Sequence, residues 1–543
     1  MKRFSVLDRE QWLKEAQNTD YDIIIIGGGI TGAGILLDAT TRGLKAVLFE
    51  KADFASGTSS RSTKLIHGGL RYLKQLEFGL VHESGTERAI VHKNAPHIVL
   101  SENMLLPIFK DGSLGEWTTS MGLQVYDFLA GVEKQEKRKM LSAEETSEKE
   151  PLLKSEDLTG GGIYKEYRTD DARLVIEVLK KAVHYNAKAF NYTTVNSFTY
   201  ENEVVNGIKV YDEIANNEFT IKGKTVINAT GPWVDEVRIK DEKIKGNHLQ
   251  LTKGVHIVVD YKKLPLQQSV YFDVEDGRMI FAIPRNNITY IGTTDTFYDA
   301  EKEEPNITNE DITYLLNAAN DMFPNVEITK KDVQSGWSGL RPLIHQEGKS
   351  ASELSRKDEI FISSKGLISI AGGKLTGYRK MAERAVDEAI EILEEKFDIE
   401  AEPCITKQIK LSGGDFNNPV DIHRVNSELQ LKYQDKLSNE LIHKMVFRYG
   451  SNAHFIFEKL PLNCKEFDLV NAEIDYCIEQ ECITNINDFV IRRTGMLYFE
   501  RPYLNAIIDN ISMQIRKHLK TLESHININD EKLNVINDSL NFD

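Results

Sequence analysis

The most constraining feature of this chain is the segment 22–51, which has the pattern of a strand, a glycine-rich turn, a helix and a second strand. Four isoleucines, Ile23 to Ile26, are typical of a strand that is buried on both faces. A Gly-x-Gly-x-x-Gly motif follows at residues 27–32, then an apolar helical pattern, then the strand Ala46 to Phe49. The order of these parts predicts a dinucleotide-binding βαβ unit, which a glycine triplet alone would not.

Each glycine of the motif has a physical role in such a unit. Gly27 permits the tight turn, Gly29 lets the backbone approach a pyrophosphate, and Gly32 lets the helix pack closely on the strand. The helix N-terminus offers N–H groups and a positive dipole end to the phosphates. Glu50 ends the second strand, where an acidic residue binds a ribose hydroxyl and disfavours NADP.

The residues after the second strand favour a flavin dinucleotide over a nicotinamide one. A small, hydroxylated run from Ser56 to Ser62 stands where a nicotinamide enzyme usually continues into another helix and strand. This run supplies many hydrogen-bonding groups and little bulk, so it can lie along an extended cofactor. The chain is therefore predicted to bind FAD.

Length and charge restrict the function further. With 543 residues, the chain is expected to hold two or three domains. Its net charge of −16 opposes a broad nucleic-acid-binding surface, so no nucleic-acid partner is expected. The four cysteines have no metal-ligand spacing, so no metal site is expected. Because no apolar run reaches the roughly 20 residues of a spanning helix, any membrane association is expected to be peripheral.

The remaining chain divides into regions of different pattern. Residues 76–150 are predicted to be mostly helical, whereas alternating apolar positions in residues 245–335 indicate an antiparallel sheet. A buried strand at Val226 and Ile227 leads into Ala-Thr-Gly. A second strand meets Gly372 and Gly373 before a long helix, which makes another helix N-terminus suited to an anion. Beyond about residue 395 the pattern is largely helical.

Several motifs together resemble the family of FAD-dependent, respiratory (aerobic) glycerol-3-phosphate dehydrogenases. They are IIGGGITGAG, TSSRSTKLIHGGLRYL, NATGPWVD, LTKGVHIVVD, GTTDT, GLRPL, AGGKLTGYRKMAE and DFVIRRT, in the family's order from about residue 20 to about residue 500. The resemblance implies an α/β protein with a glutathione-reductase-like FAD-binding Rossmann domain, an antiparallel β-sheet substrate domain and a C-terminal helical cap domain.

The implied domains are discontinuous along the chain. The FAD-binding domain is expected to comprise residues 20–75, 155–235 and 336–394. The substrate-binding domain is expected to comprise residues 76–154 and 236–335, and the cap domain residues 395–543.

The resemblance also implies a reaction and its setting. The chain would oxidise sn-glycerol 3-phosphate to dihydroxyacetone phosphate by hydride transfer to the flavin, and the electrons would pass to membrane quinone. The family further implies a homodimer in the cytoplasm that is peripherally associated with the inner face of the cytoplasmic membrane.

The cofactor-binding residues are expected in the glycine motif, the hydroxylated run, the Ala-Thr-Gly turn and the second glycine junction. They are Gly27, Gly29, Ile30, Thr31, Gly32, Glu50, Thr58, Ser59, Ser60, Lys64, Leu65, His67, Gly68, Thr230, Gly231, Gly373, Lys374, Leu375 and Thr376.

A substrate that carries a phosphate beside a secondary alcohol needs fixed cations. The residues that match the family's substrate pocket are Arg71, Tyr72, His256, Arg341 and Lys374, and Arg356 stands where the family has another basic residue. A guanidinium suits this role because it binds phosphate oxygens through two parallel hydrogen bonds. Each residue also has a plainer interpretation, as a surface arginine, a core tyrosine or a half-buried histidine.

The expected catalytic residues are His256, Arg341 and Lys374. His256 is expected to remove the hydroxyl proton, because the unperturbed pKa of a histidine lies near working pH. Lys374 and Arg341 are expected to hold the phosphate and to stabilise the developing alkoxide. His67 is expected only to support the FAD loop.

Three alternatives remain open from the sequence. A glycerol-3-phosphate oxidase would use oxygen and make hydrogen peroxide, but such relatives tend to carry an insertion where only about 30 residues separate Arg341 from Gly372 here. A flavin-dependent RNA-modification enzyme, or another amine or amino-acid oxidase, would not be expected to combine these motifs. A non-catalytic FAD-binding scaffold would hold a flavin that glycerol 3-phosphate cannot reduce.

Overall fold

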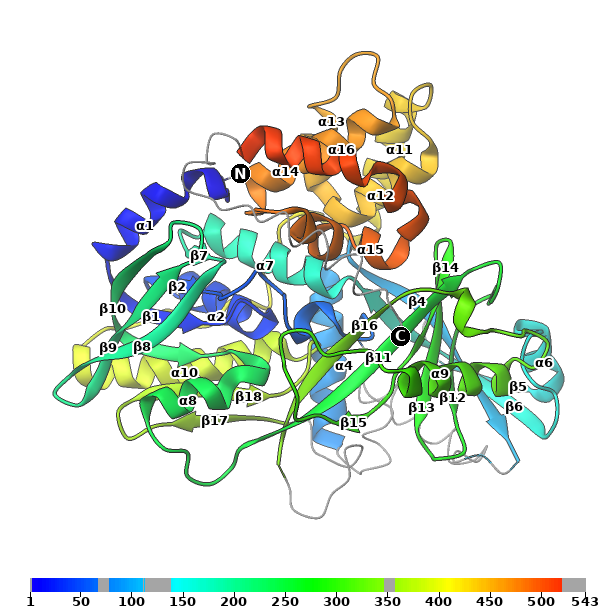
Figure 1. Cartoon of the computed structure of the whole chain (residues 1–543), viewed down its shortest axis with the longest axis horizontal. Helices are drawn as coiled ribbons and strands as arrows, with labels where there is room; N and C mark the ends of the chain where they lie inside the picture. Colours follow the sequence, from blue (N-terminus) through cyan, green and yellow to red (C-terminus); the bar gives the residue numbers. More distant parts are fainter. Residues whose placement is uncertain (1, 67–77, 111, 113–137, 346–356, 520–543) are drawn as a thin grey trace.

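The computed structural model describes residues 2–66, 78–110, 112, 138–345 and 357–519. In this part of the chain, two β-sheets carry helices on their faces, and a group of C-terminal helices lies across one side of both (Figure 1). The sheets meet where strand β16 (Val333–Ile344) contacts strand β18 (Leu367–Gly372).

The first sheet has a parallel core that begins with the strand of four isoleucines. Within the described residues its order is β17-β18-β10-β1-β2-β7, with the hairpin β8–β9 attached to β10. Strands β18, β10, β1, β2 and β7 are parallel to their neighbours, and β17 is antiparallel at the edge. The bounds are β1 (Asp20–Ile26), β2 (Ala46–Phe49), β7 (Lys188–Phe190), β8 (Thr193–Glu201), β9 (Val204–Asp212), β10 (Asn217–Asn228) and β17 (Asp358–Ile362).

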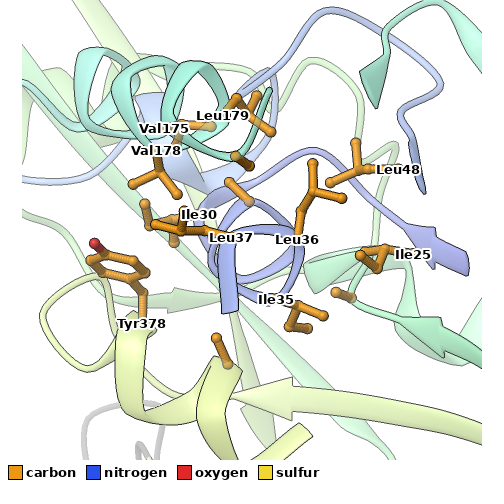
Figure 2. Close-up of a cluster of buried hydrophobic side chains, with 14 of the residues drawn as sticks. Ile25, Ile30, Ile35, Leu36, Leu37, Leu48, Val175, Val178, Leu179 and Tyr378 are labelled. Atoms are coloured by element: carbon orange, nitrogen blue, oxygen red, sulfur yellow. The ribbon is translucent and has the colours of Figure 1, made fainter. Parts of the chain in front are cut away.

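Helix α2 (Ile30–Thr41) forms the centre of the largest hydrophobic core. It packs between the first sheet, helix α7 (Asp171–His184) and helix α10 (Tyr378–Phe397), as Figure 2 shows. Two glycines permit this packing. A Cβ at Gly32 would lie 1.9 Å from the Gly27 carbonyl oxygen, and a Cβ at Gly34 would lie 2.9 Å from the Tyr378 ring. The helix therefore approaches both the sheet and α10 more closely than any larger residue would allow.

The second sheet is mixed. Its order in the described residues is β15-β11-β14-β13-β12-β4-β6-β3, with β16 paired to β11 and β5 to β6. Most neighbours are antiparallel, as expected, but β4 and β12 are parallel. The bounds are β3 (Leu65–Ile66), β4 (Val99–Phe109), β5 (Lys139–Ser142), β6 (Leu158–Thr169), β11 (Leu249–Asp260), β12 (Ser269–Asp273), β13 (Met279–Arg285), β14 (Ile288–Gly292) and β15 (Thr296–Phe297).

The prediction that residues 76–150 are mostly helical was wrong for part of this region. Helices α4 (Phe78–Asn94) and α6 (Ala143–Lys149) do form, but β4 runs between them and β5 precedes α6. The six residues from Met104 to Phe109 are all buried. A short continuous apolar run of this kind fits a buried strand and a buried helix equally well, so its periodicity could not decide between them.

The division into domains stays a prediction, and sheet pairing differs from its boundaries at two places. Strands β6 and β16 pair into the second sheet, although most of both lie inside the ranges expected for the FAD-binding domain. Helices α1 (Arg9–Gln17) and α8 (Val234–Asp241) contact the first sheet, whereas α9 (Asn309–Met322) contacts the second.

The C-terminal region is helical in its described part, as the sequence predicts. Its helices share a hydrophobic core of their own. They are α11 (Ile422–Tyr433), α12 (Asn439–Tyr449), α13 (Ala453–Phe457), α14 (Glu466–Gln480), α15 (Met496–Phe499) and α16 (Arg501–Leu519). Across the described ranges, no helix is both long enough and apolar enough to cross a membrane.

A buried ion-pair network joins the C-terminal helices to the first sheet. Arg493, which is fully buried in the π-helical turn Asp488–Arg493, donates to both carboxylate oxygens of Asp53 at 2.7 and 2.9 Å. Asp53 lies three residues beyond Glu50, and it also pairs with Arg492. Both arginines therefore pair with a buried residue of the dinucleotide unit.

A second part of the network involves helix α7. Arg173 is fully buried and donates to both oxygens of Glu481, at 2.6 and 2.9 Å, and it also pairs with Glu177. Lys180 lies 3.1 Å from Glu481 and completes the cluster.

Burial alone raises the pKa of Asp53, but the charges of Arg493 and Arg492 more than offset this and lower that pKa to about 2.

Replacement of Asp53 by Asn should strongly destabilise the protein. The substitution removes the buried carboxylate to which Arg493 and Arg492 both donate. Loss of one partner of a buried ion pair typically costs about 3–5 kcal/mol. Urea denaturation of the two proteins, followed by circular dichroism, measures the difference.

The matched control is Glu10→Gln, because Glu10 forms an ion pair with Lys14 on the exposed face of α1. Exposed pairs contribute little, so this variant should unfold at the wild-type midpoint. Equal midpoints for Asp53→Asn and the wild type would show that the network does not stabilise the fold.

Candidate active site

A cavity of about 400 Å³ lies between the two sheets and collects most of the predicted site residues. Its walls come from the β1–α2 turn, the end of β2, the run 56–65, the turn after β10, strands β11 and β16, and the junction after β18. The predicted residues that line it are Gly27, Gly29, Ile30, Thr31, Glu50, Thr58, Ser59, Leu65, Thr230, Gly231, His256, Arg341, Gly373, Lys374, Leu375 and Thr376.

The turn before α2 is built to bring its backbone close to a ligand. Gly27 has φ +108°, and a Cβ there would lie 2.6 Å from the Ala229 carbonyl oxygen. Gly29 is the N-cap of α2 and, being glycine, has no side chain that could cap the helix, so the first turn can offer N–H groups to an anion. Ser59 Oγ accepts a hydrogen bond from Ile30 N at 3.0 Å, which holds the hydroxylated run beside the helix N-terminus.

Glu50 is fixed by the backbone at the end of β2. One carboxylate oxygen accepts from Gly28 N at 2.6 Å and the other from Ala52 N at 2.9 Å. Burial raises the pKa of Glu50, and these two hydrogen bonds counteract the rise. Because each carboxylate oxygen can accept more than one hydrogen bond, Glu50 keeps acceptor capacity for the hydroxyls of a ligand in the cavity that it lines.

The second glycine junction, after β18, lines the same cavity. Gly372 and Gly373 have φ +81° and +77°, a conformation that larger residues rarely adopt. A Cβ at Gly373 would lie 2.3 Å from Met381 Sδ, so the turn packs against α10. Lys374 Nζ donates to Ser84 Oγ of α4 at 3.4 Å.

His256 projects from β11 into the wall that the second sheet contributes. Its ring stacks on Trp337 with centroids 4.8 Å apart and planes at 12°, and its Nε2 lies 3.0 Å from Thr63 Oγ1. A Cβ at Gly292 would lie 2.2 Å from His256 Cδ2, so the opposing strand must carry glycine. Burial, helped by the charges of Arg341 and Lys64, holds the pKa of His256 well below its usual value.

Arg341 stands on β16, beside the strand that carries His256. Its guanidinium donates to Asp295 at 3.1 Å and to Thr293 Oγ1 at 3.0 Å. A Cβ at Gly254 would lie 2.2 Å from its Nη2, so glycine again makes the space for the functional side chain. The contacts hold the cation at the cavity wall, where it can attract an anionic ligand.

Three predicted cofactor-binding residues lie behind the cavity wall. Gly32 packs against the Gly27 turn, and Ser60 is buried. Lys64 donates to Asp171 at 2.6 Å and to the Ser60 carbonyl at 2.9 Å, so its charge is paired inside the protein. We assign these residues supporting roles. Five further predicted residues lie outside the described residues, namely His67, Gly68, Arg71, Tyr72 and Arg356.

Other cavity residues were not predicted from the sequence. Thr63 contacts His256, and Lys51, Trp233 and Thr193 line the dinucleotide side of the cavity. Thr63 belongs to the motif TSSRSTKLIHGGLRYL, but other hydroxyl side chains in that motif were equally good candidates for the site. Thr193 begins an ordinary strand, and nothing in its local sequence marks it.

Comparison with known proteins shows the family to which the chain belongs. Residues 22–379 match the family described as FAD dependent oxidoreductase, and residues 404–525 match the C-terminal domain of alpha-glycerophosphate oxidase. The chain is 51% identical to the aerobic glycerol-3-phosphate dehydrogenase of Staphylococcus epidermidis over 93% of each chain. It is 50% identical to the enzyme of the same description from Bacillus subtilis over 94% of each chain.

A solved structure extends the similarity to three dimensions. The glycerol-3-phosphate dehydrogenase from Bacillus halodurans complexed with FAD has a TM-score of 0.80 and 41% identity, and the match covers 99% of this chain and 97% of that one. These matches confirm the fold and the enzyme class that the motifs predicted. The chain therefore belongs to the FAD-dependent oxidoreductases and, among them, to the family of aerobic glycerol-3-phosphate dehydrogenases.

Proposed function

We propose that this chain binds FAD in the cavity and oxidises sn-glycerol 3-phosphate to dihydroxyacetone phosphate, with the electrons passing to membrane quinone. The main support for this proposal is that one cavity is lined by residues from both sheets. The first sheet contributes two glycine junctions that admit a dinucleotide backbone, and the second contributes His256 and Arg341. The relatives that share half of this sequence are described as aerobic glycerol-3-phosphate dehydrogenases.

In this proposal the cavity residues of the first sheet hold the cofactor. The Gly27 turn and the N-terminus of α2 would hold the pyrophosphate, Glu50 would hold a ribose, and the residues after Gly372 would hold the rest of the cofactor. FAD, when bound, supplies the acceptor for the hydride that leaves the alcohol carbon.

The substrate phosphate is assigned to the cations that face the cavity. Arg341 and Lys374 both line the cavity, Arg341 on β16 of the second sheet and Lys374 just after β18 of the first. A phosphate dianion bound between them would form ion pairs with both. Arg71, Tyr72 and Arg356 remain part of this assignment through the family motifs. Tight positioning of the alcohol carbon follows from holding the phosphate, since the two groups are on neighbouring carbons.

His256 is assigned as the base that takes the hydroxyl proton. Because burial and neighbouring cations lower its pKa, the imidazole is neutral at physiological pH and can accept a proton. Arg341 and Lys374 would stabilise the negative charge that develops on the oxygen as its proton leaves.

Quinone as acceptor, peripheral attachment to the inner face of the cytoplasmic membrane and a homodimer belong to the proposal through the family. The short connection from Arg341 to Gly372 supports the dehydrogenase over the oxygen-using oxidase.

Anaerobic titration of the purified protein with sn-glycerol 3-phosphate tests the proposal as a whole. The visible flavin absorption should bleach stoichiometrically, and it should recover slowly in air but rapidly with a soluble quinone. Fast recovery in air with peroxide release would identify an oxidase instead. A bound flavin that stays oxidised would exclude this substrate.

Replacement of Arg341 by Gln should raise the substrate KM by about 10- to 100-fold, because a hydrogen bond to a charged group contributes about 1.5–3 kcal/mol. Steady-state kinetics with a soluble quinone measure KM and kcat separately. Arg424→Gln serves as the control, since Arg424 pairs with Glu428 on the exposed surface of α11 and does not line the cavity. An unchanged KM in the Arg341 variant would remove this residue from the phosphate site.

Replacement of His256 by Asn should slow flavin reduction by about 10²–10⁴-fold, as expected for loss of a general base. In the wild type, protonation of His256 stops the reaction. Its lowered pKa therefore places the acid limb of the rate profile below about pH 6.5, the usual histidine value. The variant should lose this limb.

Stopped-flow reduction at saturating substrate, measured across the pH range, gives both results. The control is His248→Asn, because His248 is exposed just before the same strand. A wild-type acid limb that persists in the His256 variant would assign the titration to another group.

A further inference from the structure

The surroundings of His256 restrict how a substrate proton can reach it. The side chain is 1% exposed, and its Nδ1 is buried without a hydrogen-bond partner in the described part of the chain. Trp337 covers one face of the ring, and Gly292 lies against its Cδ2 edge. The remaining nitrogen, Nε2, lies 3.0 Å from Thr63 Oγ1. Thr63 and His256 both line the cavity, and the Thr63 hydroxyl occupies the hydrogen-bonding position at this nitrogen.

We propose that Thr63 is a catalytic residue whose hydroxyl relays the substrate proton to Nε2 of His256. This inference rests on the proposed function and adds a residue that links the substrate to the base.

The backbone around Thr63 is held firmly enough for such a role. On one side, Asp171 accepts from Ser62 N at 3.0 Å and Ser62 Oγ at 2.7 Å. On the other side, the same carboxylate binds Lys64 Nζ at 2.6 Å. Asp171 is fully buried in the first turn of α7. Both neighbours of Thr63 are therefore fixed to one rigid group.

Two aromatic side chains of the second sheet also hold Thr63 and Ser62, through their carbonyl groups. Tyr290 donates its hydroxyl to the Thr63 carbonyl at 3.2 Å, and Trp337 donates its indole N–H to the Ser62 carbonyl at 2.9 Å. Because Trp337 also stacks on His256, one ring positions both ends of the Thr63–His256 contact. Geometry held in this way by helix α7 and the second sheet is what proton transfer over a short hydrogen bond requires.

The relay moves two protons, and one hydride leaves the same substrate. The alcohol proton of the substrate moves to Thr63 Oγ1 as the Thr63 hydroxyl proton moves to His256 Nε2, and Thr63 ends as a neutral hydroxyl. The carbon–hydrogen electron pair leaves with its hydrogen as hydride to the flavin, and the carbon–oxygen bond becomes a carbonyl. His256 ends as an imidazolium, so the tautomer that begins the reaction carries its hydrogen on Nδ1. The charged groups that face this ring in the described residues are Arg341 and Lys64, and the titratable Tyr290 lies beside it.

Stopped-flow reduction of the holoenzyme by sn-glycerol 3-phosphate tests the relay with Thr63→Val and Thr63→Ser. Valine keeps the shape of threonine without its hydroxyl, so the limiting rate of flavin reduction should fall by about 100-fold or more. Serine keeps the hydroxyl, so its rate should remain within about fivefold of wild type, well short of the loss of a general acid–base group. FAD content and substrate affinity should change little in either variant. Thr220→Val, at an exposed threonine of β10, is the control.

A measurement on the unaltered enzyme keeps the test independent of folding. Two protons move together in the relay, so the limiting rate plotted against the deuterium fraction of the solvent should curve, whereas direct transfer of one proton gives a straight line. A straight line would overturn the relay, as would equal slowing by valine and serine or a wild-type rate for valine. If the wild-type flavin is not reduced at all, the proposed function fails instead.

Discussion

The buried ion pairs between the dinucleotide unit and the C-terminal helices are the interaction on which the rest of the structure depends. Asp53 follows the strand that ends at Glu50, and its carboxylate is bound by arginines more than 400 residues away in the chain. A buried charge without its partner is costly, so this arrangement admits one docking geometry of the helices and disfavours others. The same helices contribute Glu481 to the cluster around α7, the helix whose first turn holds Asp171.

The two sheets line the cavity with different kinds of groups. The first sheet supplies turns in which glycine lets backbone N–H groups reach a ligand, which suits a polyanionic cofactor. The second sheet supplies side chains with reactive chemistry, and glycines on neighbouring strands make space for His256 and Arg341. Burial lowers the proton affinity of His256, so the base is neutral where a free histidine would be partly charged.

Much of this could be predicted from sequence because the signals are local. The βαβ unit, the second glycine junction and the helical C-terminal region each follow from periodicity and glycine spacing within short segments. Periodicity failed for β4, where a continuous apolar run fits two structures. For Lys64, the motif indicated the right segment but not the direction of the side chain, which the buried carboxylate of Asp171 decides.

The sequence by itself determined the dinucleotide fold, its cofactor class and the family. These follow from short, contiguous motifs, in which the glycines set the local backbone conformation. The tertiary structure alone decided which polar side chains meet. Thr63 faces His256 across 193 positions, and Asp53 faces Arg493 across 440. Such contacts arise from the packing of whole sheets and helices, in which the burial of many apolar groups fixes the position of a few polar ones. Periodicity and motif spacing within short segments cannot predict contacts between residues so far apart in the chain.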